Sequence, residues 1–323
     1  MEHINRPLLS ILITVYNRAI AADKILSILY DYQQRGLDFY VILSDNRSTD
    51  NIKEVCSHWA SKFRYFKFVI TEEQGIMDAN FKNAYENCET DYCWLLGDTR
   101  MVSFDSLNKI ISTLEEGQYN ALIINCHVKM NLPSTTYDDV NTLMKEQAWH
   151  ITNNSSCIIP AKFVNRSVYN RYMGTTFLHM GIFVENICLL PSFRVRYLDD
   201  VKCRTINILG FKKGGWKGHP FLNFGRLWYE YIMALPCQIA LETKQFILKD
   251  HDSKTGLFSL SEIMISKAKY SNREYVKSFI DNYHYVKHVT YRNRIIMLLE
   301  ILFIPPFVCR LIRKTYLAIR GKE

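Results

Sequence analysis

Two stretches of polar residues, each placed directly after an apolar run, contain the side chains best suited to bind a ligand. They are Thr14-Val15-Tyr16-Asn17-Arg18 and Ser44-Asp45-Asn46-Arg47-Ser48-Thr49-Asp50. Each precedes an amphipathic segment, so both are predicted to lie at the carboxyl ends of buried strands, the edge at which open α/β sheets bind ligands. The Asp45 carboxylate can accept hydrogen bonds there from a ribose or a base edge, and Ser48, Thr49 or Asp50 can cap the helix that follows.

A third apolar run, residues 92–96, also ends in polar residues, Gly97-Asp98-Thr99-Arg100. Residues 73–80 have the pattern of a loop that leads into a helix. Gly75 permits a positive φ or a close approach of the backbone, and Asp78 can cap or begin the helix. Such a junction is common in proteins, so it is informative only beside the other stretches.

The hydrophobic pattern of the first 125 residues alternates between strands and helices. Strands are predicted over residues 8–16, 39–44, 65–70, 92–96 and 121–125, and helices over 19–35, from about 51, over 77–88 and over 104–116. This alternation predicts right-handed crossovers onto a mostly parallel sheet, so the fold class is α/β. Residues 131–154 are polar and poorly periodic and are interpreted as a flexible loop over the site. Helical patterns dominate from Tyr229 onward.

The composition is that of an ordinary packed chain of enzyme size, with 323 residues, 48% hydrophobic and 22% charged. The nine cysteines include neither a Cys-x-x-Cys pair nor a Cys/His cluster at zinc spacing. We therefore expect buried thiols in a reducing compartment. A core strand that begins by Leu8 leaves no room for a signal peptide, so a cytoplasmic protein is expected.

The chain has a net charge of +8, and its C-terminal part is basic. From Lys287 to Glu323 it contains eight Lys or Arg residues and two Glu residues. The apolar run 295–304 is too short and too broken to span a bilayer, so the tail is interpreted as a peripheral anchor on an anionic membrane surface. The basic residues that would meet the headgroups are Arg292, Arg294, Arg310, Arg313, Lys314 and Arg320. The alternative is a pair of helices that packs on the rest of the chain with a basic outer face. No nucleic-acid-binding motif accompanies these charges, so nucleic acid is not expected as a partner.

The stretches at the first two strand ends resemble the opening of family 2 glycosyltransferases of the GT-A fold. In that family the first strand ends in a Tyr-Asn-Arg turn, here Tyr16-Asn17-Arg18, and the second ends in an Asp-rich Ser-Thr-Asp turn, here Ser48-Thr49-Asp50. The likeness covers roughly residues 8–180. It implies a GT-A, Rossmann-like sheet flanked by helices that binds a nucleotide-sugar donor. The residues that it assigns to the donor here are Thr14, Tyr16, Arg18 and Asp45.

The resemblance also places three residues beneath the donor nucleotide: Gly75, Asp78 and Asn80. The segment ending in Gly97-Asp98 is similar to the one where these enzymes carry an Asp-x-Asp motif, whose carboxylates hold a divalent cation against the donor diphosphate. Here the triplet is Asp98-Thr99-Arg100, so the second acid is missing. Either Asp98 holds Mg²⁺ or Mn²⁺ with help from waters and phosphate, or Arg100 lies against the diphosphate as a fixed positive charge. The alternative is that Arg100 points to solvent.

On the acceptor side, residues 174–179 are similar to the corresponding region of the abequosyltransferase-like branch, which builds bacterial O-antigens. Most family 2 enzymes place an acidic base near this point, whereas this chain has His179, with Glu185 about two turns further on if the segment is helical. His179 either takes the acceptor hydroxyl proton or completes the metal shell opposite Asp98, unless it is only structural. Asp199-Asp200 is a rival acidic pair, expected in a turn after a strand over 193–197.

The glycine-rich run 210–219 is basic and aromatic. It is expected to fold over the donor, with Lys212 or Lys213 facing the diphosphate and Trp216 stacking on a sugar face, unless it is an ordinary exposed loop. The run lacks the Gly-x-x-x-x-Gly-Lys-[Ser/Thr] pattern, so a phosphate-binding P-loop is excluded.

We therefore expect an inverting glycosyltransferase that moves a sugar from a nucleotide sugar to a lipid-linked saccharide acceptor at the inner membrane face, in O-antigen or capsule biosynthesis. Inversion follows from the resemblance. The expected domains are a catalytic domain over 1–225, with a donor half over 1–125 and an acceptor half over 126–225, and a helical region over 226–323. Two other classes remain: a catalytically silent nucleotide-sugar-binding scaffold of a polysaccharide assembly complex, and a nucleotidyltransferase. The altered triplet supports the first, and the absence of a Gly-rich basic loop after the first strand weakens the second.

Overall fold

The computed structural model describes residues 6–208 and 219–320. The chain divides into two compact units. Unit 1 comprises Met1–Leu143 and His150–Lys213, and unit 2 comprises Met144–Trp149 and Gly214–Glu323. The glycine-rich run that was expected to fold over the donor lies outside the described residues, except for His219.

Unit 1 contains an eight-stranded sheet in the order β3-β2-β1-β4-β8-β6-β9-β7. The strands are β1 (Leu9–Val15), β2 (Tyr40–Asp45), β3 (Phe66–Ile70), β4 (Tyr92–Gly97), β6 (Ala121–Asn125), β7 (Thr135–Tyr137), β8 (Cys157–Pro160) and β9 (Val195–Lys202). Only β8 and β7 run antiparallel to their neighbours in this sheet. The short strands β5 (Arg100–Met101) and β10 (Arg204–Thr205) form a separate antiparallel pair. The mostly parallel sheet predicted from the sequence is confirmed.

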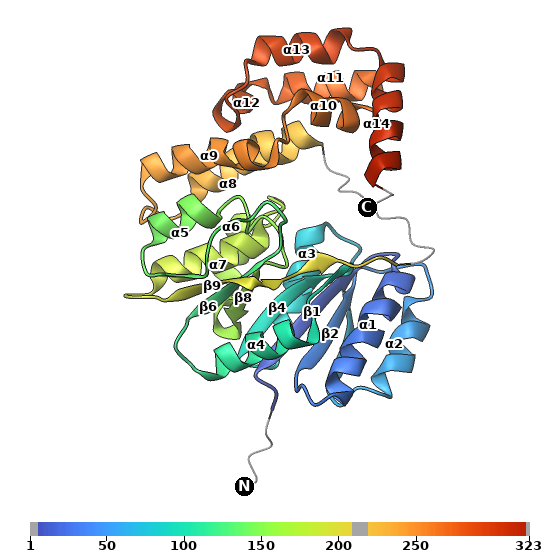
Figure 1. The fold of residues 1–323 in the computed structure, drawn as a ribbon, viewed down its shortest axis with the longest axis vertical. Helices are drawn as coiled ribbons and strands as arrows, with labels where there is room; N and C mark the ends of the chain where they lie inside the picture. The colour runs from blue at the N-terminus through green and yellow to red at the C-terminus, as the bar shows by residue number, and fades with distance from the viewer. Residues whose placement is uncertain (1–5, 209–218, 321–323) are drawn as a thin grey trace. The chain divides into compact units, whose positions relative to one another are not determined.

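Helices cover both faces of this sheet (Figure 1). Those of unit 1 are α1 (Ala19–Gln34), α2 (Ile52–Ala60), α3 (Met77–Glu86), α4 (Phe104–Glu115), α6 (Arg166–Tyr172) and α7 (Leu178–Leu189), and α5 (Val140–Gln147) is divided between the units. Alternate β1 residues from Leu9 to Val15 share a core with apolar side chains of α1, α2 and α4. On the other face α3 packs against β1, β2 and β4. Helix α1 ends just before Gly36, whose φ of 102° few other residues adopt.

The strand register brings the predicted polar stretches together. Val15 of β1 lies opposite Asp45 of β2, and Thr14 lies opposite Gly97 of β4. Because all three strands are parallel, their carboxyl ends meet at one edge of the sheet. The residues Tyr16 to Arg18, Asn46 to Asp50 and Asp98 to Arg100 therefore follow three adjacent strands.

Two secondary-structure expectations are wrong. The polar segment 131–154, which was expected to be a loop, contains β7 and helix α5. Asp199 and Asp200, which were expected in a turn, lie inside β9. At this point Ile124 of β6 pairs with Leu198 but Asn125 pairs with Lys202, so the strand bulges, and its apolar pattern is interrupted without the strand ending.

Unit 2 is helical, as the pattern from Tyr229 onward predicts. It contains a π-helical turn over Phe221–Leu227 and the helices α8 (Trp228–Ala234), α9 (Leu241–Thr255), α10 (Leu260–Lys267), α11 (Asn272–Asp281), α12 (Tyr283–Val289), α13 (Arg294–Phe303) and α14 (Pro306–Arg320). Its core includes Phe221, whose ring contacts those of Phe258, Tyr275 and Phe279. In the described part of the chain, no single helix has both the length and the apolar character needed to cross a bilayer. Helix α13 and the Pro306–Tyr316 part of α14 reach that length together, but they are bent by 96°.

Candidate active site

The turns that follow β1 and β2 are bonded to each other. Asn17, with a φ of 52°, donates its backbone N–H to the Ser48 hydroxyl at 2.7 Å, and its side-chain oxygen accepts the backbone N–H of Thr49, also at 2.7 Å. Asp45 accepts the backbone N–H of Ser48 on both carboxylate oxygens, each at 3.1 Å. Its side chain is fully buried, so the turn holds a carboxylate at the end of β2. The strained φ of Asn17 is maintained by these bonds.

Asn46 joins this turn to the Gly75 loop. Its side chain accepts the backbone N–H of Gly75 at 2.9 Å and donates to the carbonyl of the same residue at 2.8 Å. The neighbouring Arg47 has a φ of 58° and donates to the carbonyls of Thr71 and Glu72. The sequence reasoning did not single out Asn46 as a functional residue. Its only signal is its position directly after Asp45, and that is too weak to identify a bond with a loop almost thirty residues away.

The bonded turns after β1 and β2 and the Gly75 loop form a framework at the sheet edge, and two further contacts connect it to helices. Asp50, which was expected to cap the helix that follows it, instead accepts the backbone N–H of Ala19 at 2.8 Å and caps α1 from the neighbouring turn. Asn80 is buried, donates to the Val15 carbonyl at 3.2 Å and accepts the Ser44 hydroxyl at 2.7 Å. Asn80 therefore ties α3 to the ends of β1 and β2. These are the strand ends that the predicted donor residues follow.

Two exposed residues flank this framework. Tyr16, after β1, is 44% exposed and its hydroxyl bonds with the Gln74 side chain. Ile76, after Gly75, is 54% exposed. Thr14 is the partly buried residue of β1 that lies between Ser44 and Gly97 of the neighbouring strands. The framework thus presents an aromatic ring and an apolar side chain beside its polar strand ends.

Asp98 and Arg18 form an ion pair across the ends of β4 and β1. Arg18 Nη1 lies 3.0 Å from Asp98 Oδ1, and the carboxyl side chain is only 13% exposed. Burial raises the pKa of Asp98, and the Arg18 guanidinium opposes that rise. The turn before Asp98 is fixed because the Gly97 N–H donates to the Ser155 hydroxyl at 2.9 Å. Arg18 and Asp98, which the sequence placed in the donor site, are therefore in direct contact.

Arg100 is held by backbone carbonyls. Its Nη1 donates to the carbonyl oxygen of Cys126 at 3.1 Å and approaches that of Cys203 at 3.5 Å. On the paired strand, Arg204 bonds in the same way to the carbonyls of Asn125 and Cys203. Among the described residues no hydrogen-bond partner is found for the other guanidinium nitrogens of Arg100, so the group is positioned without using all its donors.

The described residues do not fit a protein-built metal site. No group of three or more His, Cys, Asp or Glu side chains in the described ranges is placed to hold a metal ion. Asp98 has an arginine as its ion-pair partner. His179, the second predicted ligand, is 5% exposed, and its Nε2 lies 3.2 Å from the Ile151 carbonyl. A cation held by Asp98 therefore remains a prediction that relies on ligands from outside the chain.

His179 and Glu185 both lie on α7 but on different sides of it. Six residues of α-helix correspond to a rotation of about 600°, so the two side chains are about 120° apart around the axis. Burial lowers the pKa of His179 to about 4, so the imidazole is neutral near pH 7. Glu185 Oε1 pairs with Arg171 at 2.9 Å. Both side chains keep one buried atom, Nδ1 and Oε2, without a hydrogen-bond partner among the described residues.

Asp78 connects α3 to the loop before α7. The side chain is 1% exposed, and its Oδ2 accepts the backbone N–H groups of Gly174 at 2.9 Å and Thr176 at 3.0 Å. Gly174 and Thr176 have φ values of 83° and 70°. Burial raises the pKa of Asp78 to about 6, against the effect of these hydrogen bonds. Asp78 thus joins the predicted donor loop to the region that resembles an acceptor site.

We expect Asp78 to make stability depend on pH. The pKa of Asp78 is higher in the folded state than in the unfolded state, so protonated Asp78 adds to the free energy of unfolding. This contribution is fully present below the unfolded pKa near 4 and is lost as the pH rises through the folded pKa of about 6. Two pKa units correspond to at most about 3 kcal/mol of unfolding free energy. Asp78→Asn, which keeps a side-chain acceptor, should remove this pH dependence, whereas Asp78→Ala should destabilise at every pH by about 1–3 kcal/mol because two buried N–H groups lose their acceptor. Urea unfolding at pH 5 and pH 7 measures both effects, and equal pH dependence of wild type and Asp78→Asn would contradict the assignment.

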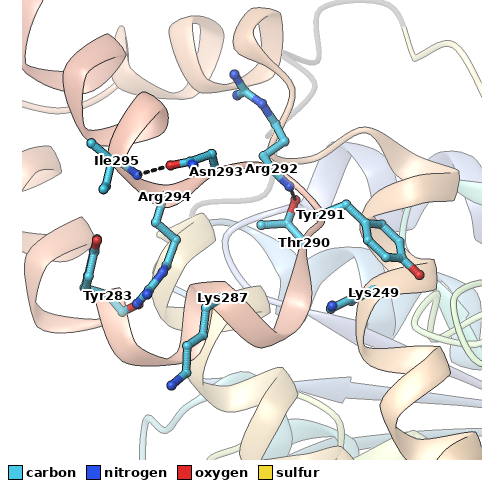
Figure 2. Close-up of a pocket in the computed structure, with 9 residues that line it drawn as sticks. All are labelled: Lys249, Tyr283, Lys287, Thr290, Tyr291, Arg292, Asn293, Arg294 and Ile295. Atoms are coloured by element: carbon cyan, nitrogen blue, oxygen red, sulfur yellow. Dashed lines mark hydrogen bonds between the residues drawn. The ribbon is translucent and has the colours of Figure 1, made fainter.

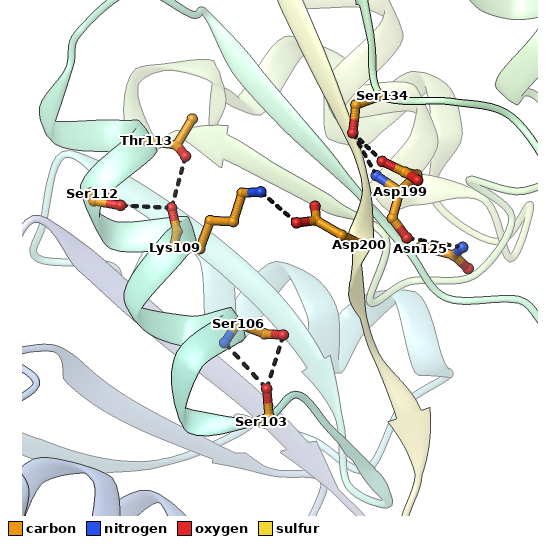
Figure 3. A network of polar contacts seen from close by, with 9 residues as sticks. All are labelled: Ser103, Ser106, Lys109, Ser112, Thr113, Asn125, Ser134, Asp199 and Asp200. Carbon is orange, nitrogen blue, oxygen red and sulfur yellow. Dashed lines mark hydrogen bonds and ion pairs between the residues drawn. The ribbon is translucent and has the colours of Figure 1, made fainter.

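Asp199 and Asp200, the rival acidic pair, are engaged in contacts around the β9 bulge (Figure 3). The Asp199 carboxylate accepts the Ser134 hydroxyl, and Asp200 pairs with Lys109 of α4. The Ser134 hydrogen bond is the largest cause of the lowered pKa of Asp199. Both side chains therefore have local partners that account for their positions.

Unit 1 has a mostly parallel sheet with helices on both faces, Asp45 at the end of β2 and an ion-paired Asp98 after β4, which is a GT-A-like fold. The sequence model of the family "Glycosyl transferase family 2" matches residues 10–172, half of the chain. The chain belongs to this family.

Curated relatives match parts of the chain. Abequosyltransferase RfbV of Salmonella typhimurium is 28% identical over 114 residues, which are 34% of this chain and 33% of that protein. Validoxylamine A glucosyltransferase of Streptomyces hygroscopicus subsp. jinggangensis is 36% identical over 77 residues, 24% of this chain and 18% of that protein. The chain thus spans a third or less of the length of these relatives.

Solved structures match over nearly the full length. S. aureus TarS 1–349 in complex with UDP-GlcNAc has a TM-score of 0.61 at 13% identity, with 95% of this chain and 91% of that chain covered. TarS 1–349 in complex with UDP has a TM-score of 0.56 at 11% identity, with 98% and 92% covered. At these identities the likeness establishes the fold.

Proposed function

We propose that this protein is an inverting glycosyltransferase that transfers a sugar from a nucleotide-sugar donor to a hydroxyl group of a lipid-linked saccharide. The proposed setting is bacterial surface polysaccharide biosynthesis, O-antigen or capsule, at the inner face of the cell membrane. The observation that carries the proposal is the bonded framework at the ends of β2, β1 and β4, which holds Asp45 and the Arg18–Asp98 pair on three adjacent strands. Membership of family 2 and the likeness to an abequosyltransferase support it.

In this proposal the nucleoside lies against the β2 end of the framework. Asp45 accepts hydrogen bonds from the base or the ribose, and the exposed Tyr16 ring provides a flat apolar face. Asn46 and Asn80 keep Gly75 and the ends of β1 and β2 in place, so the site is pre-formed. TarS, whose fold is similar, is bound to UDP and UDP-GlcNAc in its structures.

The diphosphate lies toward β4. Its leaving oxygen gains negative charge as the acceptor hydroxyl attacks the sugar. The cations proposed to neutralise this charge are Arg18, the ion-pair partner of Asp98, and Arg100, which follows Asp98 in the same motif. Inversion requires one displacement by a deprotonated hydroxyl. Neutral His179, through its unpartnered Nδ1, and Glu185, through Oε2, are the two candidates for the proton acceptor. Because they face different sides of α7, only one of them can serve a given acceptor position.

We expect Asp45→Asn to weaken binding of UDP by about 10- to 100-fold, since a charge-assisted hydrogen bond is worth about 1.5–3 kcal/mol. The Asn side chain retains an oxygen that can accept the Ser48 N–H, so the turn is preserved. The matched control is Asp38→Asn, which removes a carboxylate just before the other end of β2. Titration calorimetry measures the affinities. Unchanged affinity in Asp45→Asn would remove Asp45 from the nucleotide site.

The competing function is a nucleotide-sugar-binding scaffold without catalytic activity, which the replacement of the second motif acid by Arg100 favours. The two functions differ in one product. An enzyme releases free nucleoside diphosphate when donor and acceptor are both present, whereas a scaffold binds the donor and releases none. A screen of nucleotides and nucleotide sugars for thermal stabilisation identifies the donor to use, because a ligand of the native state raises its stability.

A further inference from the structure

Helix α13 of unit 2 presents a wholly apolar exposed face. The exposed residues of the helix are Ile295, Ile296, Leu299, Leu302 and Phe303, which are 46–75% exposed. At about 100° per residue they fall within an arc of about 120°. Met297 and Ile301, on the opposite side, are fully buried. A continuous apolar arc of this kind is typical of an interaction surface rather than of scattered surface residues.

This orientation of α13 is fixed by two sets of polar contacts. Near its C-terminus, the buried Lys267 donates to the carbonyls of Ile301 at 2.5 Å and Ile304 at 2.7 Å. On the side of the helix, Glu300 pairs with Arg292 at 2.6 Å. The apolar arc is therefore the stable outer face of a packed helix.

A basic pocket lies where α13 begins (Figure 2). Its volume is about 320 Å³, and its lining residues are Lys249, Tyr283, Lys287, Thr290, Tyr291, Arg292, Asn293, Arg294 and Ile295. Lys249 lies over the Tyr291 ring at 4.8 Å, and Arg294 lies over the Tyr283 ring at 4.3 Å. Ile295 belongs both to the pocket and to the apolar arc, so the two features adjoin.

The charges around the pocket are mostly positive. Among the described residues, Arg292 is the one of its four cations that has a carboxylate partner, Glu300, and the nearby Asp252 accepts the Thr290 hydroxyl at 2.5 Å. His288, on the same helix as Lys287, has a pKa lowered first by burial and then by the charges of Lys287, Lys249, Arg294 and His284. The pocket therefore has an excess of positive charge that an anion can neutralise.

The other end of the apolar arc also borders basic residues. A second pocket of about 580 Å³ is lined by Asn272, Arg273, Val276, Lys277, Ile280 and Leu302. Ile280 is 57% exposed and extends the apolar surface from Leu302 onto α11. The surface thus combines an apolar centre with basic side chains at both ends.

We propose that this surface docks on an anionic phospholipid bilayer, with the apolar arc of α13 in the interface and a lipid phosphate headgroup in the pocket that contains Lys249 and Lys287. The combination of buried apolar area and electrostatic attraction is what stable peripheral binding needs. Charge complementarity selects this occupant over a second copy of the chain, because a symmetric contact would bring two basic pockets together. The inference rests on the proposed attachment to the membrane but not on the reaction.

The test is co-sedimentation of the full chain with vesicles of phosphatidylcholine, with and without phosphatidylglycerol. Lys249→Gln/Lys287→Gln should lower the partition coefficient on the anionic vesicles by about 25-fold, about fivefold for each basic residue. Leu299→Asn should lower it by about tenfold or more on both kinds of vesicle. The matched controls in the same unit are Lys269→Gln and Leu241→Asn, which remove an exposed charge and an exposed leucine elsewhere, and they should change little.

Nucleotide binding by the same variants separates this inference from the proposed function. If the wild type binds UDP but not anionic vesicles, the membrane inference is overturned and the proposed nucleotide-sugar binding stands. If it binds anionic vesicles but not UDP, the membrane inference stands and the proposed function is overturned. Concentration-dependent dimerisation that Leu299→Asn abolishes, without vesicle binding, would show that α13 is an interface between copies. Equal loss of vesicle binding in the control variants would also overturn the assignment of the pocket. Glycerol phosphate in solution should not displace the protein from vesicles, because it supplies the anion without the apolar phase.

Discussion

Asp98→Ala is expected to lower kcat for sugar transfer by at least about 100-fold, the usual cost of removing one preorganised charge from a transition-state site. Asp98 lies directly after β4, is 13% exposed and holds Arg18 at 3.0 Å. Without the carboxylate, Arg18 loses its ion pair with Asp98, and a cation held by Asp98 at the diphosphate loses that ligand. The fold should remain intact, because Arg18 is more exposed than Asp98 and can be hydrated. Release of nucleoside diphosphate in the presence of acceptor measures the rate, and circular dichroism checks the fold.

The matched control is Asp91→Ala, which removes an exposed carboxylate at the other end of the same strand and should leave kcat unchanged. A double-mutant cycle with Arg18→Ala then separates two roles of Asp98. If Asp98 only positions Arg18, removing it in the Arg18→Ala background should have no further effect. If Asp98 acts on the donor directly, the two losses should add. Retained turnover in Asp98→Ala would exclude Asp98 from the diphosphate site.

The donor half of the fold could be predicted because its signals are local. Each strand from β1 to β4 is an apolar run of strand length, and each is followed by polar or turn-forming residues. In a mostly parallel sheet these strand ends lie at one edge, so the shared edge that carries Asp45, Arg18 and Asp98 could be predicted. The strand order and register that bring Asp45 and Gly97 beside β1, and the Arg18–Asp98 ion pair, come from the structure.

The remaining features depend on contacts between distant segments. The bond of Asn46 to Gly75 and that of Asp78 to Gly174 join residues that no pattern links. The bulge in β9 interrupts the alternation around Asp199, so a strand was interpreted as a turn. Helix α5 was missed because it is only eight residues long and lies within a polar segment. The two hydrogen bonds and the β6–β9 pairing at the bulge join segments that are too far apart in the sequence for hydrophobic periodicity to reveal them.

Arg100 shows the same limit most clearly, since the sequence left it either beside the diphosphate or in solvent. Its Nη1 donates to the Cys126 carbonyl, so the guanidinium group does not point freely into solvent. Its other N–H groups can still donate to a ligand. Replacing it by Ala therefore removes a structural bond as well as a charge. Arg204→Ala is the matched control, because Arg204 makes the same kind of carbonyl bonds on the paired strand but lies outside the Asp98-Thr99-Arg100 triplet.

If Arg100 supplies part of the charge that neutralises the leaving diphosphate, transfer by the wild type should persist at a reduced rate in excess chelator. Arg100→Ala should then depend on added Mg²⁺ or Mn²⁺ far more strongly, with a loss of about 100- to 1000-fold in chelator, whereas Arg204→Ala should keep the metal response of the wild type. Arg100→Asp restores the second acid and should tighten cation binding, measured by calorimetry. Complete loss of wild-type activity in chelator, together with normal activity of Arg100→Ala, would instead mean that Asp98 holds a cation with other ligands. His179 would be the first of these to test, although its Nε2 lies 3.2 Å from the Ile151 carbonyl oxygen.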